Sequence, residues 1–244
     1  GTGFVGKHLA NRLVKNGWHV RLLTRQREQH RDFLVLPTLE LVSTNVSSQD
    51  QLNTDLAGCD AIINLVGILN ETGNDGAGFH HAHVELPQKL VTACRTNHIQ
   101  RLLHLSALNA DAQQGPSHYL RTKGVGEDLL HAANGLNVTS FRPSVIFGED
   151  DSFVNRFAKL LRVPSYVFML PCATARFAPV WIEDVVTAMM QTLDEPKHYG
   201  QRYNLCGPKV YTLQQLVEYT AQLLSVKRLV VPLNDKYSHL AARL

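Results

Sequence analysis

Gly1-Thr2-Gly3-Phe4-Val5-Gly6 is the stretch of sequence that decides the fold. Its glycines have the G-x-G-x-x-G spacing of a turn that joins a β-strand to an α-helix. The first glycine permits the tight turn, the second lets the backbone approach a pyrophosphate, and the third lets the helix lie close to the sheet. A glycine-rich turn without a ligand is the alternative, so the surrounding sequence has to decide. Because the motif needs a strand before it, we expect an apolar strand immediately before Gly1.

Helices and strands alternate after this loop. We predict helices at residues 5–16, 48–56, 83–97 and 118–133, and strands at residues 19–23, 39–42, 61–66, 101–105 and 138–142. Asn16-Gly17 ends the first helix. Such alternation is typical of an α/β protein with a Rossmann-type doubly wound parallel sheet, in which ligands bind at the carboxyl ends of the strands.

The alternation is looser in the last part of the chain, where prolines separate helices predicted at residues 152–162, 182–193 and 212–224. Thr212 and Gln215 have the spacing of a capping box. We therefore expect a dinucleotide-binding Rossmann domain at residues 1–148 and a small C-terminal substrate lobe at residues 149–244, interleaved with the sheet. Five apolar side chains of this lobe either line a pocket or form its core, and we expect the core: Phe153, Phe157, Phe168, Met169 and Phe177.

Composition narrows the class of protein. The chain has 244 residues, 44% of them hydrophobic and 18% charged, with a net charge of +3, which is an ordinary globular composition. No dense basic stripe indicates a nucleic-acid partner. The longest apolar run, residues 61–69, is too short to span a bilayer. Four cysteines lie far apart without C-x-x-C or metal-ligand spacing, so we expect buried, reduced thiols in a cytoplasmic protein: Cys59, Cys94, Cys172 and Cys206.

Tyr119 and Lys123 are the first candidates for chemistry. They are four residues apart and lie on one face of a predicted helix. An ammonium beside a phenol favours the phenolate, so we expect Lys123 to lower the pKa of Tyr119 and make it a general acid/base. Ser106 follows a predicted strand, and its hydroxyl can hold a carbonyl oxygen that Tyr119 protonates while a hydride arrives from a nicotinamide. A surface tyrosine near a surface lysine is the alternative.

Together these motifs resemble the short-chain dehydrogenase/reductase superfamily, in its extended and atypical branches that include nucleotide-sugar epimerases. The resemblance runs the length of the chain. It implies catalysis by Ser106, Tyr119 and Lys123. The family's fourth-strand turn is similar to residues 64–67, its nicotinamide loop to residues 142–148, its acidic turn before a late helix to residues 181–185, and its closing strand to residues 203–205 with Gly207.

A closer resemblance, to the nucleotide-binding accessory subunits of respiratory complex I and their bacterial relatives, is carried by His83-Val84-Glu85-Leu86-Pro87, by Tyr119-Leu120-Arg121 with Gly126-Glu127, and by Phe147-Gly148-Glu149-Asp150. It implies a tightly held NADP(H) in a structural role. A partner in a respiratory or membrane-associated complex, with peripheral attachment at the cytoplasmic membrane, is then the alternative to a cytoplasmic enzyme. His83 stands where many relatives carry an asparagine that supports a proton relay.

NADP(H) is the cofactor that Arg25 favours, because an arginine after the second strand suits the additional phosphate, whereas an acidic residue would bind the ribose hydroxyl of NAD(H). Arg27 or Arg31 can assist, although we favour a solvated basic face as the explanation of both. Asn45-Val46 takes the place of the family's Asp-Val at the adenine edge, where an amide can hydrogen-bond the adenine amino group. The expected cofactor contacts are Gly1, Thr2, Gly3, Phe4, Val5, Gly6, Thr24, Arg25, Asn45, Val46, Leu65, Val66, Gly67, Leu105, Lys123, Pro143 and Val145.

Other candidates have simpler explanations. His80, His81 and His83 lack a carboxylate or cysteine at a familiar metal-ligand spacing, so we expect a helix entry and no metal. His118 either meets substrate or is exposed at a helix start. Arg142 either binds a substrate anion or pairs with Asp184 or Glu183, and we favour the pair. The basic segment 227–228, with residues 236–244, either touches a membrane or packs on the protein.

Overall fold

The computed structural model describes residues 1–71, 73 and 75–233, and the chain divides into two compact units. The first unit comprises Gly1–Pro143 and Glu183–Leu205, and the second comprises Ser144–Ile182 and the chain from Cys206 onward. The predicted boundary at residue 148 lies close to the first crossing at Pro143. The chain then returns to the first unit for an α-helix, a short 3₁₀ helix at Pro196–His198 and a strand.

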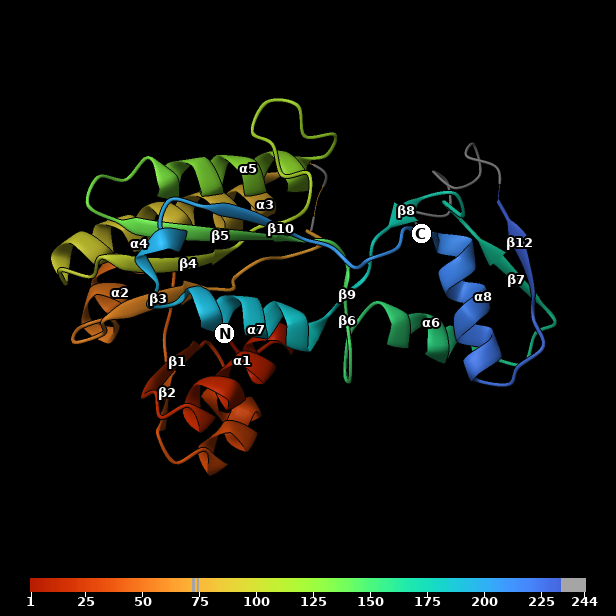
Figure 1. The fold of residues 1–244 in the computed structure, drawn as a ribbon, viewed down its shortest axis with the longest axis horizontal. Helices are drawn as coiled ribbons and strands as arrows, with labels where there is room; N and C mark the ends of the chain where they lie inside the picture. Colours follow the sequence, from red (N-terminus) through yellow and green to blue (C-terminus); the bar gives the residue numbers. More distant parts are fainter. Residues whose placement is uncertain (72, 74, 234–244) are drawn as a thin grey trace. The chain divides into compact units, whose positions relative to one another are not determined.

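A four-stranded parallel sheet forms the centre of the first unit (Figure 1). Its strand order is β10-β5-β4-β3, with bounds Arg202–Leu205, Asn137–Pro143, Arg101–Leu105 and Ala61–Asn64. Ile62 of β3 lies beside Leu102 of β4, which lies beside Val138 of β5. Every neighbouring pair is parallel, as the alternation of helices and strands predicts.

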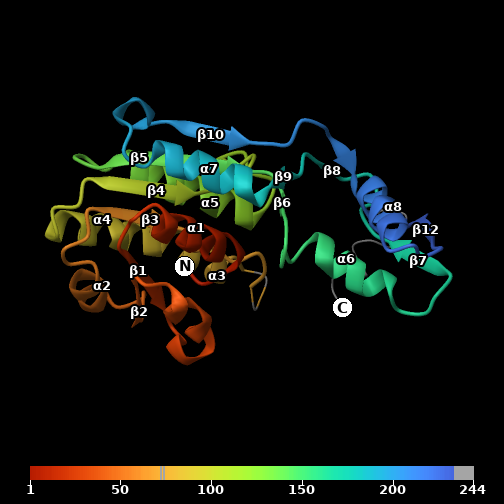
Figure 2. The same cartoon turned by 60° about the horizontal axis from the view of Figure 1, so that its bottom comes forward.

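Helices cover both faces of this sheet (Figures 1 and 2). α4 (Leu86–Thr96) and α5 (His118–His131) lie on one face, and α7 (Ile182–Thr192) lies on the other. The buried guanidinium of Arg101 fixes the end of α7, because it donates to the carbonyl oxygens of Thr192 at 2.7 Å and Leu193 at 2.8 Å.

Two further parallel strands, β1 (Val20–Thr24) and β2 (Leu39–Ser43), form a separate sheet. An apolar cavity of about 590 Å³ lies between β1 and β3, and its lining includes Leu22, Ile62 and Gly6. In the described part of the chain, β1 pairs only with β2 and β3 pairs only with β4, so the strand edges at the cavity have no partner strand.

Helix starts and ends follow the sequence signals. α1 (Phe4–Lys15) ends at Asn16 and Gly17, where Gly17 has a φ of 82° that suits glycine. Ser48 accepts a hydrogen bond at the start of α2 (Gln49–Asp55). The predicted helix at residues 83–97 instead begins earlier, because α3 (Ala77–His80) and a π-helical turn (His81–Glu85) precede α4. The polar connection after β1 contains a 3₁₀ helix at Arg27–Val35.

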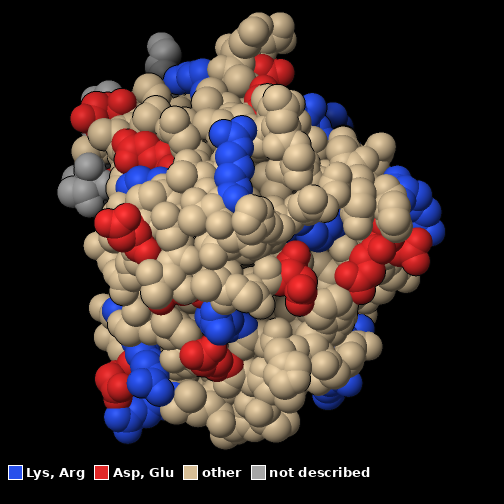
Figure 3. Space-filling view, turned by 90° about the vertical axis from the view of Figure 1, so that its left-hand side faces the viewer, with Lys and Arg blue, Asp and Glu red and all other residues tan. Residues whose placement is uncertain are grey.

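Acidic and basic side chains are interspersed on the face that Figure 3 presents. No large area of one sign gathers there, in keeping with the small net charge of +3. In the described residues, no helix combines the length and apolarity needed to cross a bilayer.

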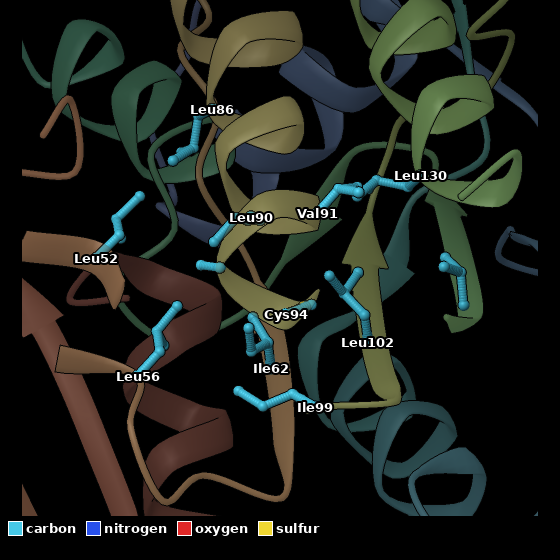
Figure 4. Packing of buried hydrophobic residues seen from close by; sticks show 12 residues of the cluster. Leu52, Leu56, Ile62, Leu86, Leu90, Val91, Cys94, Ile99, Leu102 and Leu130 are labelled. Atoms are coloured by element: carbon cyan, nitrogen blue, oxygen red, sulfur yellow. The ribbon is translucent and has the colours of Figure 1, made fainter. Parts of the chain in front are cut away.

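The main core of the first unit lies between α2, α4, α5 and the sheet (Figure 4). Leu52, Leu102 and Leu130 have exposed fractions of 1%, 0% and 0%. Full burial of one leucine contributes about 1.5–3 kcal/mol. Cys94 is buried in this core and Cys59 packs against it. Cys172 and Cys206 are exposed, so the expectation of four buried thiols is wrong for these two.

Up to residue 233, the second unit is built from short paired strands and two helices. α8 (Leu213–Leu223) begins at the predicted capping box of Thr212 and Gln215. Phe153, Phe157, Phe168 and Phe177 pack on its core, as expected, but Met169 is 59% exposed and is not a core residue. The remaining elements are α6 (Val154–Leu161) and the strand pairs β6 (Ile146–Phe147) with β9 (Val180–Trp181), β7 (Val167–Leu170) with β12 (Leu229–Pro232), and β8 (Arg176–Phe177) with β11 (Tyr211–Thr212).

The basic segment at the end of the second unit is only partly described. The Arg228 side chain donates to the carbonyl oxygens of Leu161 at 3.0 Å and Val163 at 3.2 Å, so this residue packs on the protein. The predicted membrane contact of residues 236–244 lies outside the described residues.

Candidate functional site

The glycine loop leads directly into α1. Gly3 is the N-cap of this helix, and no side chain caps the free N–H groups of its first turn. A Cβ atom on Gly6 would overlap the carbonyl oxygen of Gly1, so this position requires glycine. A Cβ on Gly3 would meet nothing within 4 Å, which leaves open space beside the N-terminus of α1. Free N–H groups beside open space suit a phosphate.

The ends of β1 and β2 present polar groups. Thr24 is buried, and its Oγ1 accepts a hydrogen bond from the Gln26 N–H at 3.3 Å. Arg25 is exposed, and its side chain makes no hydrogen bond or ion pair within the described residues. Oδ1 of Asn45 accepts from the Ser47 N–H at 3.0 Å, which leaves the amide Nδ2 and one lone pair for another partner. Val46, next to it, is half-buried.

Helix α5 carries both Tyr119 and Lys123. Ser117 caps the helix by accepting from the Leu120 N–H. Lys123 is 3% exposed, and its Nζ donates to the carbonyl oxygen of Leu105 at 2.6 Å. Burial lowers the pKa of Lys123 to about 8, although the carboxylate of Glu127 acts in the opposite direction. This lysine is therefore mostly protonated at neutral pH.

Tyr119 lies among aromatic rings. Its ring centroid is 5.4 Å from that of His83 and 5.9 Å from that of Phe79, both in edge-to-face geometry. Burial raises the pKa of Tyr119 above its ordinary value of 10. The sequence-based expectation of a lowered Tyr119 pKa is therefore wrong for this structure, because burial removes the phenol from water and disfavours the charged phenolate. The phenol is protonated at neutral pH.

Ser106 follows directly after β4 and is 4% exposed. Its N–H donates to the carbonyl oxygen of Phe141 at 2.7 Å, which fixes the backbone. Its Oγ is buried and has no hydrogen-bond partner within the described residues. A buried hydroxyl without a partner costs about 1–3 kcal/mol, so a site of this kind favours a ligand or water that completes the bond. Lys123 donates to the carbonyl oxygen of Leu105, the residue immediately before Ser106.

The turn after β3 completes this group. The Val66 N–H donates to Oδ1 of Asn64 at 3.1 Å, which shapes the turn that contains Leu65. A Cβ on Gly67 would lie 3.6 Å from Nε2 of His83 and 3.8 Å from Nζ of Lys123. The Leu65–Val66–Gly67 turn and α5 therefore meet at one place, at the carboxyl end of the sheet.

Two predicted cofactor residues lie at the crossing between the units. The carbonyl oxygen of Pro143 accepts from the Leu108 N–H at 2.9 Å within the first unit. The carbonyl oxygen of Val145 accepts from the Val180 N–H at 3.0 Å within the second unit.

A buried ion cluster below Lys123 is the main feature that the sequence reasoning missed. Glu127 is 0% exposed, and both its oxygens lie 3.0 Å from Nε of Arg142. Nε of Arg202 lies 2.9 Å from Oε1 of Glu127. The predicted pairing of Arg142 with Asp184 or Glu183 is wrong in its partner, since Glu183 instead binds His8 and Arg12 of α1.

Two signals in the sequence point to this packing in retrospect. Glu127 is four residues after Lys123, on the same helix face. Gly124 and Gly126 lie between these two residues in the sequence, and a Cβ on Gly126 would overlap the carbonyl oxygen of His83. Glycines inside a helix indicate a close approach of another backbone.

The histidines near α4 separate into two groups. His80 and His81 are exposed and both lie near Glu85, with Nδ1–oxygen distances of 3.4 Å and 2.8 Å. His83 is buried. Among the described residues, no group of histidine, cysteine and carboxylate side chains has the arrangement of a metal site. His118 is exposed at the first position of α5.

Comparison with known proteins places this geometry in context. The model of the NAD dependent epimerase/dehydratase family matches residues 1–206. The chain is 29% identical over 224 residues to NADH dehydrogenase [ubiquinone] 1 alpha subcomplex subunit 9, mitochondrial, of Arabidopsis thaliana, covering 89% of this chain and 54% of that protein. It thus spans about half the length of this relative.

A reductase and an epimerase are also similar. The chain is 31% identical over 169 residues to the 4-hydroxy-2-methyl-3-oxo-4-farnesyl-3,4-dihydroquinoline-1-oxide ketoreductase of Stigmatella aurantiaca, covering 62% of this chain and 50% of that protein. A structure of UDP-glucuronic acid 4-epimerase from Bacillus cereus, in complex with UDP-glucuronic acid and NAD, superposes with a TM-score of 0.79 at 19% identity, covering 96% of this chain and 84% of that one. At this identity, the structural likeness establishes the Rossmann-type fold.

Proposed function

Because the chain belongs to the NAD-dependent epimerase/dehydratase family, we propose that it binds NADP(H) and interconverts a carbonyl and a hydroxyl group by means of Ser106, Tyr119 and Lys123. The supporting observation is the buried Ser106 Oγ without a partner in the described chain, next to the Leu105 carbonyl that Lys123 binds. A ligand oxygen at this place would complete the hydrogen bonding of Ser106.

The residues divide the chemistry among them. Ser106 donates a hydrogen bond to the substrate oxygen and holds it. Tyr119, protonated at neutral pH because burial raises its pKa, donates the proton that this oxygen needs during reduction. Lys123, which lies one helical turn after Tyr119 and is mostly protonated at neutral pH, would favour the phenolate that remains. When bound, the nicotinamide supplies the hydride. The protonated phenol suits reduction of a carbonyl better than oxidation of an alcohol at neutral pH.

The nucleotide fits the residues that are present. Gly3 and the first turn of α1 offer free N–H groups to a pyrophosphate, and Gly6 permits close packing of helix and turn. Arg25, exposed and without a partner in the described chain, is the group that would select the additional phosphate of NADP(H). The remaining predicted contacts of the first unit, from Thr24 to Pro143, would line the rest of the dinucleotide.

A second candidate function is a structural one, in which the chain holds the nucleotide permanently as an accessory, assembly or sensing subunit of a respiratory complex. The similarity to a mitochondrial NADH dehydrogenase subunit favours it. Peripheral attachment at a membrane would follow from such a partner. Epimerase or dehydratase chemistry on a nucleotide sugar is the third candidate, which the family membership supports.

Nucleotide exchange and turnover separate these candidates. The full chain would be stripped of nucleotide, reloaded with NADPH or NADH, and assayed with panels of ketones, quinones and nucleotide sugars. The enzyme proposal expects exchange and NADPH oxidation that falls about 10²–10⁴-fold in Tyr119→Phe, and no loss in Tyr219→Phe, whose ring is 60% exposed in the second unit. A nucleotide that neither leaves nor reacts, with a large loss of stability on its removal, would favour the structural role.

A further inference from the structure

His83 occupies an unusual place in the backbone. It lies in the π-helical turn at His81–Glu85, between α3 and α4. Such turns are rare and often occur at functional sites. Unlike His80 and His81, which are exposed, His83 is 2% exposed and turned toward α5. The proposed chemistry assigns it no role.

The hydrogen bonds of His83 define its tautomer. The backbone N–H of Ile68 lies 3.1 Å from Nε2, so Nε2 accepts and carries no proton. Nδ1 must then carry the proton, and it lies 3.0 Å from Oγ1 of Thr122, which accepts. The Thr122 hydroxyl in turn donates to the carbonyl oxygen of His118 at 2.8 Å. Every polar atom of the imidazole is thus engaged by a different segment.

The ring also contacts the groups of the candidate site. Phe79 stacks on it with centroids 5.7 Å apart and an interplanar angle of 24°. The ring of Tyr119 meets it edge-to-face at 5.4 Å and 82°. A Cβ on Gly67 would lie 3.6 Å from Nε2. Burial and the positive charge of Lys123 lower the pKa of His83 to about 3, so the ring is neutral at physiological pH.

We propose that His83 is a positioning residue: a neutral imidazole that joins the Gly67–Ile68 turn to α5 and holds the ring of Tyr119 against it. This role rests on the proposed function of Tyr119. In this arrangement the Nε2 lone pair is occupied by Ile68 and the Nδ1 proton by Thr122. The imidazole therefore has no free atom for carrying protons between Tyr119 and solvent. It sets the geometry and does not relay protons.

Two substitutions distinguish positioning from relay. His83→Gln places an amide oxygen near the position of Nε2 and keeps an acceptor for Ile68, but it cannot titrate. His83→Leu removes both hydrogen bonds. Positioning predicts that His83→Gln retains kcat within about 3-fold with an unchanged pH profile, whereas His83→Leu lowers kcat about 10–100-fold because Tyr119 is displaced. The KM for NADPH changes little in either variant, and the exposed His81→Gln serves as the control.

A spectroscopic measurement keeps the test independent of turnover. In the ¹⁵N-labelled full chain, long-range ¹⁵N–¹H correlation spectra of the imidazoles identify His83 by its loss in His83→Gln. The expected result is an Nδ1–H tautomer that does not titrate between pH 5 and 9. An Nε2–H tautomer, a ring that titrates in this range, or equal loss of kcat in His83→Gln and His83→Leu would overturn the inference. If no carbonyl substrate turns over, the proposed function fails, and the spectrum still tests the predicted tautomer of His83 independently.

Discussion

Glu127 offers a quantitative test of how α5 is held in place. Its carboxylate is fully buried and binds Arg142 at the end of β5 and Arg202 at the start of β10. It therefore connects the helix that carries Tyr119 and Lys123 to two strands. Glu127→Gln keeps the size of the side chain and removes its charge.

The expected loss in the free energy of unfolding depends on how far the two arginine side chains are exposed to water. Removal of one partner from a buried ion pair costs about 3–5 kcal/mol. The side chains of Arg142 and Arg202 are 26% and 37% exposed, so water compensates part of this loss. Arg202 also keeps Asp128 at 2.7 Å. We therefore expect the lower end, about 3 kcal/mol, which corresponds to a decrease in Tm of about 6–12 °C for a chain of this size.

Thermal and guanidinium unfolding of the full chain measure this loss. The matched control is Asp128→Asn, which removes the neighbouring carboxylate from the same Arg202. Because Asp128 is 58% exposed, its ion pair contributes less than about 1 kcal/mol. Equal, small effects of Glu127→Gln and Asp128→Asn would show that the buried cluster does not hold the helix.

The same substitution has a predicted effect on the pH dependence of activity. The charge of Glu127 raises the pKa of Lys123, against the larger effect of burial. Glu127→Gln therefore lowers the pKa of Lys123 further below about 8. The alkaline limb of the kcat/KM profile should move to lower pH, whereas Asp128→Asn should leave it in place.

Two further predictions concern the cofactor and Lys123. Arg25→Ala should weaken NADPH binding about 10-fold and leave NADH binding unchanged. The control is Arg31→Ala, which should change the binding of neither nucleotide because the Arg31 guanidinium pairs with Glu28. Equal effects of Arg25→Ala on both nucleotides would exclude Arg25 as the selective residue. Burial lowers the pKa of Lys123 from 10.5 in the unfolded chain to about 8 in the folded one, so the unfolded chain binds more protons between these two values. The free energy of unfolding of the wild type, relative to that of Lys123→Met, should therefore rise between pH 8 and pH 10.5. Parallel curves of unfolding free energy against pH would contradict the burial of this ammonium.

Local sequence patterns predicted most of the elements of the first unit. The glycine loop, the end of α1 at Gly17 and the start of α2 at Ser48 are determined by steric and capping effects within a few residues. The parallel pairing of β3, β4 and β5 followed from the helices between them. Such signals are contained in the local sequence.

The features that were missed depend on residues far apart in the chain. The π-helical turn of His83 has no local periodicity of its own, and its side chain is engaged by Ile68 and Thr122. The environment of Tyr119 was predicted from Lys123 alone, whereas burial by surrounding rings sets the direction of its pKa shift. Glu127 resembles a solvated helix residue until Arg142 and Arg202 are placed beside it.

Amide hydrogen exchange of the full chain with and without NADPH tests the central claim most directly, since it reports where the nucleotide binds without requiring turnover. We expect NADPH to slow exchange in the first turn of α1 after Gly3 and in the turn around Gly67, at the opposite ends of the proposed site. The amides of α2 serve as the internal reference. The predicted result is slower exchange in both segments with NADPH, and a smaller slowing when NADH replaces NADPH. Unchanged exchange in both segments at saturating NADPH would contradict the account.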